Sequence, residues 1–306
     1  MSEITVSNIQ INRLCIIGVG LIGGSLARAL KKADAVETVI GCGRGVENLQ
    51  SAQALGVIDA FEQDPAKAVA GADLVVLAMP VSSTAQVYAQ IQAQLDTDCI
   101  VTDVGSTKGS VIADLRDELG ALPPNFVPGH PIAGTEHSGV QASFAELFID
   151  RRVILTPESE TAADAVATVA AVWGAAGASV VEMDAAHHDE VLAATSHLPH
   201  LLAYGLVDTL ATMEERREIF NYAAGGFRDF TRIASSNPDM WADIVLANRE
   251  ALLPVAERFL ADLEGLRAAI EKGDRETVQA TFSRAKTQRD RFASLVGRFV
   301  KAGDLE

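Results

Sequence analysis

The chain is poor in cysteine and in basic residues, and it lacks a long apolar run. Its three cysteines, Cys15, Cys42 and Cys99, do not have the paired spacing of a zinc site or a disulfide framework, so we expect reduced core residues. Lys and Arg number 25 against 41 Asp and Glu, which gives a formal charge of −16. Because no basic patch offsets this charge, we do not expect nucleic acid as a partner.

The missing apolar run limits where the protein can reside. No segment reaches the roughly 18 uninterrupted apolar residues of a membrane span, and residues 1–12 do not resemble a secretory signal. We therefore expect a cytoplasmic protein with no membrane partner. The chain is nonetheless 48% hydrophobic, with a mean hydropathy of +0.18, which leaves apolar surface to be covered and favours an oligomer.

The first half of the chain alternates between strand-length apolar runs and helical patterns. The expected strands are 14–17, 38–42, 74–78, 100–104, 126–128, 152–155 and 180–183. The expected helices are 22–32, 46–55, 83–94, 108–119 and 162–176. Strands that are apolar throughout and joined by helices indicate a mainly parallel sheet. Residues 1–182 are thus predicted to form an α/β, Rossmann-type doubly wound domain.

The second half, residues 183–306, has no strand signal and is predicted to be all-helical. Its helical patterns cover 186–210, 214–222, 239–269 and 275–300. Gly225-Gly226 and the segment 235–238 are interpreted as turns. Pro199 should bend the first of these helices.

A glycine-rich turn follows the first strand and opens a helix. Gly18 allows the tight turn, Gly20 lets the backbone approach a pyrophosphate, and Gly23 lets helix and strand pack closely. Leu21 and Ile22 begin the helix, whose positive end would hold the pyrophosphate. This context predicts a dinucleotide site.

The end of the second strand bears on the choice of dinucleotide. NAD sites usually place Asp or Glu there, but this chain has Gly41-Cys42-Gly43-Arg44. Arg44 could pair with a 2′-phosphate, so NADP is favoured, with NAD as the alternative if Arg44 only stacks on adenine. Met79 and Pro80, after one strand, and Ser106, after another, should lie near the nicotinamide, although Ser106 could equally be a helix cap.

His130 stands just beyond an expected strand, where ligands of such sheets bind. Five segments, residues 18–23, 103–109, 130–136, 196–200 and 225–232, occur in the order found in prephenate/arogenate dehydrogenases of tyrosine biosynthesis. The sequences His-Pro-Ile-Ala-Gly-Thr-Glu, Ser-His-Leu-Pro-His and Arg-Asp-x-x-Arg carry most of this resemblance, which spans about residues 12–295.

The resemblance implies an oxidative decarboxylation in which hydride leaves ring carbon 4 for NAD(P)+, the 4-hydroxyl loses its proton, and carbon dioxide is released. By the same resemblance, His130 is the base and Ser106 orients it, while Arg232 holds the ring carboxylate. An imidazole suits the first role because it accepts protons near neutrality.

The resemblance also implies further substrate-binding residues and a homodimer. These residues are His200, Thr135, Glu136, Asp229, Gly225 and Trp241. Asp229 would orient Arg232 or join it with Glu136 in an ion network, and Gly225 and Trp241 would come from the partner subunit. His197 and His200 could hold a metal by spacing, but no third ligand follows, so none is expected. His187, His188 and Asp189 are interpreted mainly as a helix start.

Two alternatives remain open. A 6-phosphogluconate or β-hydroxyacid dehydrogenase has similar domains but needs a catalytic Lys, and residues 180–210 contain none. A non-catalytic dinucleotide sensor would be free to lose His130, Ser106 and Arg232, yet all three are present.

Overall fold

The structure, a computed structural model, describes residues 9–213 and 219–302. Its contacts divide the chain into two compact units, Met1–Arg249 and Glu250–Glu306. The first unit contains both sheets and all the side chains discussed below as a site. None of the described helices is long and apolar enough to cross a membrane.

The larger sheet has six parallel strands in the order β3-β2-β1-β4-β5-β6. The strands are β1 (Ile11–Ile17), β2 (Val36–Cys42), β3 (Ala60–Glu62), β4 (Leu74–Leu77), β5 (Ile100–Asp103) and β6 (Phe126–Val127). The helices between them are α1 (Leu21–Lys32), α2 (Val46–Ala54), α3 (Pro65–Ala68), α4 (Thr84–Ile91) and α5 (Gly109–Leu119). This confirms the Rossmann-type doubly wound sheet.

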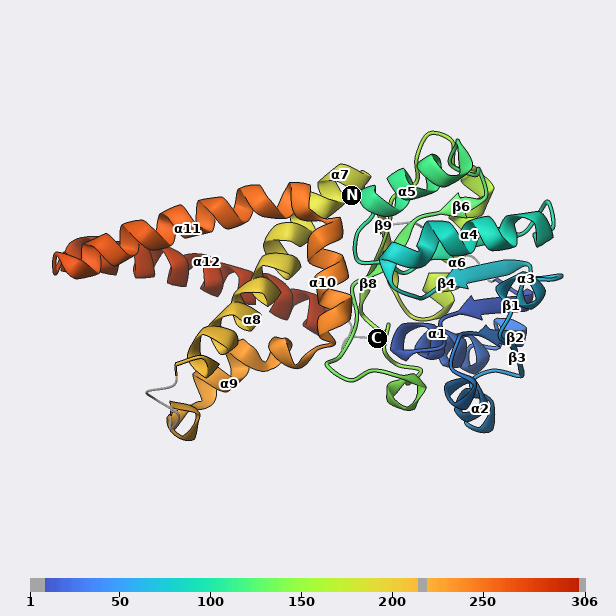
Figure 1. Cartoon of the computed structure of the whole chain (residues 1–306), viewed down its shortest axis with the longest axis horizontal. Helices are drawn as coiled ribbons and strands as arrows, with labels where there is room; N and C mark the ends of the chain where they lie inside the picture. Colours follow the sequence, from blue (N-terminus) through green and yellow to red (C-terminus); the bar gives the residue numbers. More distant parts are fainter. Residues whose placement is uncertain (1–8, 214–218, 303–306) are drawn as a thin grey trace. The chain divides into compact units, whose positions relative to one another are not determined.

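Alternate residues of each central strand build two separate cores. In β1, Leu14 and Ile16 pack with α1, α2 and α6 (Ala163–Ala175), whereas Cys15 and Ile17 pack with α3, α4 and α5. Figure 1 shows α1 and α2 on one side of the strands and α4 and α5 on the other. The cysteines are free and buried, as expected.

A smaller sheet of three strands, in the order β7-β8-β9, carries the histidine of interest. Its strands are β7 (Gly129–Pro131), β8 (Arg152–Leu155) and β9 (Ser179–Glu182), with β7 antiparallel to β8. Sequence analysis missed β3 and β7 and placed all strands in one sheet. The chain leaves the large sheet at Pro128, which has no N–H to continue the ladder.

The predicted helix 186–210 is interrupted. It consists of α7 (Ala185–Leu192), a π-helical turn at Ala193–His197, and α8 (Leu198–Ala211). Pro199, in the first turn of α8, lacks the N–H that an unbroken α-helix would need here, so the expected bend takes the form of a π-turn.

Several other helix predictions needed correction. Gly225-Gly226 does not form a turn but begins α9 (Gly225–Thr231). The predicted helix 239–269 breaks at Asn248 into α10 (Pro238–Ala247) and α11 (Arg249–Glu271). In the predicted helix 214–222, residues 219–222 form a short 3-10 turn and residues 214–218 lie outside the described residues. The last helix, α12 (Arg275–Ala302), matches its prediction closely.

Candidate functional site

The turn between β1 and α1 has the geometry of a dinucleotide cradle. Gly18 has φ +102°, and a Cβ there would lie 2.2 Å from the carbonyl oxygen of Ala78. A Cβ at Gly20 would meet no atom within 4 Å, and no side chain caps the start of α1. Open space beside uncapped backbone N–H groups at a helix start suits a pyrophosphate, so these residues fit the cofactor.

The other residues expected near the cofactor lie at the carboxyl edge of the same sheet. Arg44 is exposed just after β2, and its carbonyl oxygen accepts a hydrogen bond from Gln63. Met79 and Pro80 follow β4, and half-buried Ser106 follows β5. Ser106 is not a helix cap, since α5 begins at Gly109 with Lys108 as its N-cap.

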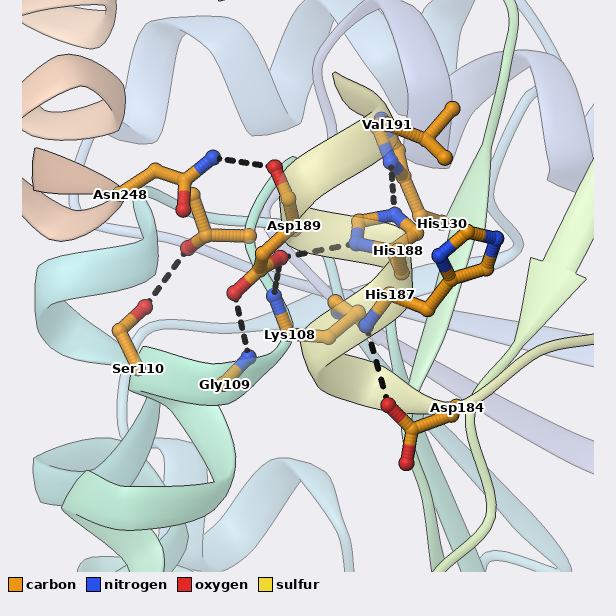
Figure 2. Close-up of polar contacts among 12 residues, drawn as sticks. Lys108, Gly109, Ser110, His130, Asp184, His187, His188, Asp189, Val191 and Asn248 are labelled. Carbon is orange, nitrogen blue, oxygen red and sulfur yellow. Dashed lines mark hydrogen bonds and ion pairs between the residues drawn. The ribbon is translucent and has the colours of Figure 1, made fainter. Parts of the chain in front are cut away.

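His130 lies on β7, paired with Ile154 of β8, rather than in a loop beyond a strand. It keeps 8% of its surface exposed. Its Nδ1 lies 2.9 Å from Nε2 of His188, as Figure 2 shows, and its Nε2 has no hydrogen-bond partner within the described part of the chain. One ring nitrogen is thus anchored and the other is available to a ligand.

His188 is held in turn by the carboxylate of Asp189. Nδ1 of His188 lies 2.8 Å from Oδ1 of Asp189, and both residues are buried on α7. The same carboxylate accepts hydrogen bonds from the backbone N–H groups of Lys108 and Gly109, at 2.9 and 2.8 Å. Asp189 therefore caps the start of α5 from a distant part of the sequence (Figure 2).

These contacts keep Asp189 ionised. Burial alone would raise its pKa, but the hydrogen bonds from His188, Lys108 and Gly109 lower the pKa of Asp189 below its usual value. A negative charge at a helix start is further favoured by the helix dipole.

A buried ion pair, Lys108 with Asp103, lies beside the histidines. Nζ of Lys108 donates to Asp103 and also to the carbonyl oxygen of Gly129, at 2.8 Å in the second case. The pair connects the end of β5 to β7. Burial, followed by electrostatic interaction with His188, Lys108 and His197, holds the pKa of His130 well below its usual 6.5. His130 is therefore neutral at physiological pH.

The two histidines of the Ser-His-Leu-Pro-His segment have different surroundings. Asn248 Nδ2 lies 2.9 Å from Nδ1 of His197, while Nε2 of His197 is buried with no partner among the described residues. Burial lowers the pKa of His197 to about 4, so the ring is neutral. Because the amide of Asn248 donates to Nδ1, the ring proton is on Nε2, which is therefore a hydrogen-bond donor. Such an unpaired buried donor suits a ligand that supplies an acceptor.

His200 stacks on Trp241, with ring centroids 3.5 Å apart and an angle of 17° between the rings. Its Nδ1 donates to the carbonyl oxygen of Ser196 at 2.8 Å, which leaves Nε2 as an acceptor. The resemblance implies that Trp241 is contributed across a dimer interface, and within its own chain it stacks on His200. The turn before α10 is held to α8 by a hydrogen bond from Tyr204 to Ser236.

The expected anion-binding residue, Arg232, pairs with Glu136 at 3.0 Å. Its side chain is 58% exposed. Asp229, expected to join this pair, instead lies 3.9 Å from Arg228. Thr135 accepts a hydrogen bond from the backbone of His137, and Gly225 begins α9 with open space around it.

Electrostatic interactions connect most of these groups: His197 acts on His130, Asp189 and His200 act on His197, and Arg232 acts on His200. The structure thus gathers His130, His197, His200 and Arg232. In the described residues, no group of three His, Cys, Asp or Glu is arranged to hold a metal ion.

Two models of one protein family match successive parts of the chain. The family model "Prephenate dehydrogenase, nucleotide-binding domain" matches residues 26–182, and "Prephenate dehydrogenase, dimerization domain" matches residues 184–284. The cyclohexadienyl dehydrogenase of Zymomonas mobilis is 45% identical over 280 residues, which are 90% of this chain and 94% of that protein. The chain belongs to the prephenate dehydrogenase family.

Two further similar proteins are also named prephenate dehydrogenases. The prephenate dehydrogenase of Bacillus subtilis is 37% identical over 279 residues, 90% of this chain and 75% of that protein. A crystal structure of prephenate dehydrogenase from A. aeolicus, in complex with hydroxyphenyl propionate and NAD+, is 36% identical with a TM-score of 0.86. The match covers 94% of this chain and 100% of that one.

Membership of the prephenate dehydrogenase family confirms the resemblance drawn from the motifs. It also makes the chain a nicotinamide-dinucleotide-dependent dehydrogenase and removes the 6-phosphogluconate type as an alternative. Sequence analysis missed four neighbours of the site: Lys108, His188, Asp189 and Asn248. The His-His-Asp run was the available signal, but Asp184, not this run, caps α7.

Proposed function

We propose that this chain oxidatively decarboxylates prephenate, arogenate or both, giving 4-hydroxyphenylpyruvate or tyrosine, in tyrosine biosynthesis. The observation that carries this proposal is His130, a neutral buried imidazole with one nitrogen anchored and the other free. The names of the relatives, cyclohexadienyl and prephenate dehydrogenase, support the substrate class.

The dinucleotide would be held by the turn of Gly18, Gly20 and Gly23 and by the N–H groups of Leu21 and Ile22, with Met79, Pro80 and Ser106 toward the nicotinamide. When bound, the nicotinamide supplies the hydride acceptor. Arg44 is exposed where a 2′-phosphate would lie, and residues 41–44 offer no carboxylate to a ribose hydroxyl. This supports NADP over NAD.

His130 would take the proton of the 4-hydroxyl on its free Nε2. As the C4–H bonding pair departs as hydride, this proton transfer turns the hydroxyl into a carbonyl. Loss of the ring carboxylate as carbon dioxide then leaves an aromatic phenolate, to which His130 returns the proton. The low pKa of His130 keeps the imidazole free to accept a proton at neutral pH.

The substrate brings two carboxylates, and Arg232 offers a guanidinium to the one on the ring. This guanidinium pairs with Glu136, so binding would exchange one carboxylate for another. His200, stacked on Trp241, would contact the substrate side chain, and Ser106 would hydrogen-bond the hydroxyl. Thr135, Asp229 and Gly225 would line the same site.

We also propose a homodimer formed through the helical part of the chain, with the functional boundary near residue 183. The match of residues 184–284 to a dimerization domain supports both statements. Apolar side chains that are more than half exposed on α11, among them Leu253 at 56% and Leu260 at 61%, would be covered by a partner.

Steady-state kinetics with prephenate and arogenate, each with NAD+ and NADP+, tests the proposal. We expect turnover of at least one substrate with release of carbon dioxide in equal amount to reduced cofactor. Tight dinucleotide binding without turnover of either substrate would instead support the non-catalytic sensor.

A further inference from the structure

A chain of buried hydrogen bonds runs from the start of α5 to His130, and each group in it constrains the next. The ionised carboxylate of Asp189 can only accept hydrogen bonds. It receives them from the backbone of Lys108 and Gly109 and from Nδ1 of His188. Nδ1 of His188 must therefore carry a proton.

With its proton on Nδ1, a neutral His188 presents a lone pair on Nε2. That nitrogen lies 2.9 Å from Nδ1 of His130, so His130 must donate. We propose that His188 and Asp189 fix the tautomer of His130, placing its proton on Nδ1 and its lone pair on Nε2, the nitrogen that faces the substrate. This role rests on the proposed function of His130 as the base.

The opposite pair of tautomers would leave His130 without a lone pair on Nε2, and it could not act as the base. If Nε2 of His188 carried a proton, it would donate to Nδ1 of His130, and the proton of His130 would move to Nε2. A His188 ring with protons on both nitrogens would also donate from Nε2 to His130, even with Asp189 ionised. The charged groups near the pair are Asp189 and the buried ion pair of Lys108 with Asp103.

The same chain acts during turnover without a second proton transfer. When Nε2 of His130 accepts the substrate proton, the ring becomes an imidazolium that still donates Nδ1–H to His188. The carboxylate of Asp189 then stabilises the positive charge through His188, against the opposing influence of Lys108 and of burial. His188 and Asp189 are thus positioning residues, since neither touches the substrate.

Nitrogen-15 NMR of the histidine rings in the wild-type protein tests the tautomer directly. We expect the His130 signals of a neutral ring with the proton on Nδ1, assigned by their loss in His130→Asn. A His130 ring with its proton on Nε2 would overturn the inference. This measurement needs no substrate, so it tests the tautomer independently of activity. Failure to turn over prephenate and arogenate would contradict the proposed function and would leave the NMR result unaffected.

A variant supplies the kinetic test. In Asp189→Asn, the amide should donate to Nδ1 of His188 and reverse both tautomers. This should lower kcat by up to about 10⁴, the loss that the corresponding change causes in a Ser-His-Asp triad. KM should stay within about threefold, because substrate contacts are untouched. The control is His187→Asn, the neighbouring exposed histidine, which should retain wild-type kcat. A wild-type kcat in folded Asp189→Asn would refute the role; if this variant does not fold, the wild-type NMR measurement decides.

Discussion

Removing the charged amino group of Lys108 should destabilise the protein strongly. The Lys108→Met substitution leaves Asp103 buried, with two backbone donors, Gly105 at 2.8 Å and Gly129 at 3.0 Å, but no cation. Breaking a buried ion pair by removing one partner costs about 3–5 kcal/mol, and the two remaining donors favour the lower value, about 3 kcal/mol. For a cooperative unit of this size, that corresponds to a Tm lower by about 6–12 °C.

The assay is urea unfolding followed by circular dichroism, with thermal melting as a second measurement. Lys31→Met is the matched control, because Lys31 pairs with Asp59 at 2.8 Å but is partly exposed, and should cost at most about 1 kcal/mol. The double variant Lys108→Met/Asp103→Asn should be more stable than Lys108→Met alone, because no buried charge remains. Equal losses in the Lys108 and Lys31 variants would refute the reasoning.

Four further predictions concern the site. His130→Asn should lower kcat by about 10²–10⁴ while dinucleotide Kd, measured by fluorescence titration, changes little. In the wild type, because the pKa of His130 is lowered, kcat/KM should fall only as pH drops well below 6.5; a fall beginning at or above 6.5 contradicts the assigned base. Arg232→Gln should raise KM about 10–100-fold through loss of a charge-assisted hydrogen bond, and an unchanged KM would remove Arg232 from the site. Arg44→Ala should raise the Kd of NADP more than that of NAD, and equal effects would show that Arg44 does not read the 2′-phosphate.

Local patterns in the sequence were sufficient for the large sheet apart from its short edge strand β3. The turn at Gly18, Gly20 and Gly23 and the apolar runs of β1 and β4 depend on neighbours in the chain, so their spacing predicts their structure. The helix break at Asn248 and the π-turn before Pro199 depend on packing as well, and sequence periodicity placed continuous helices across both.

The neighbours of His130 could not be predicted because they come together over long separations. His188 is 58 residues from His130, and Asp189 is 81 residues from Lys108. The strand β7 is only three residues long, too short for an alternating pattern to reveal it. Without the register of β7 against β8, nothing indicated which ring nitrogen of His130 would be anchored.

One carboxylate serves two parts of the fold. Asp189 belongs to α7 of the helical region, yet it completes the first turn of α5, which follows the dinucleotide-binding sheet. A protein in which α7 failed to dock against the sheet would lose the cap of α5 and the anchor of His130 together. On the proposed mechanism, only molecules with α7 docked would be competent for catalysis.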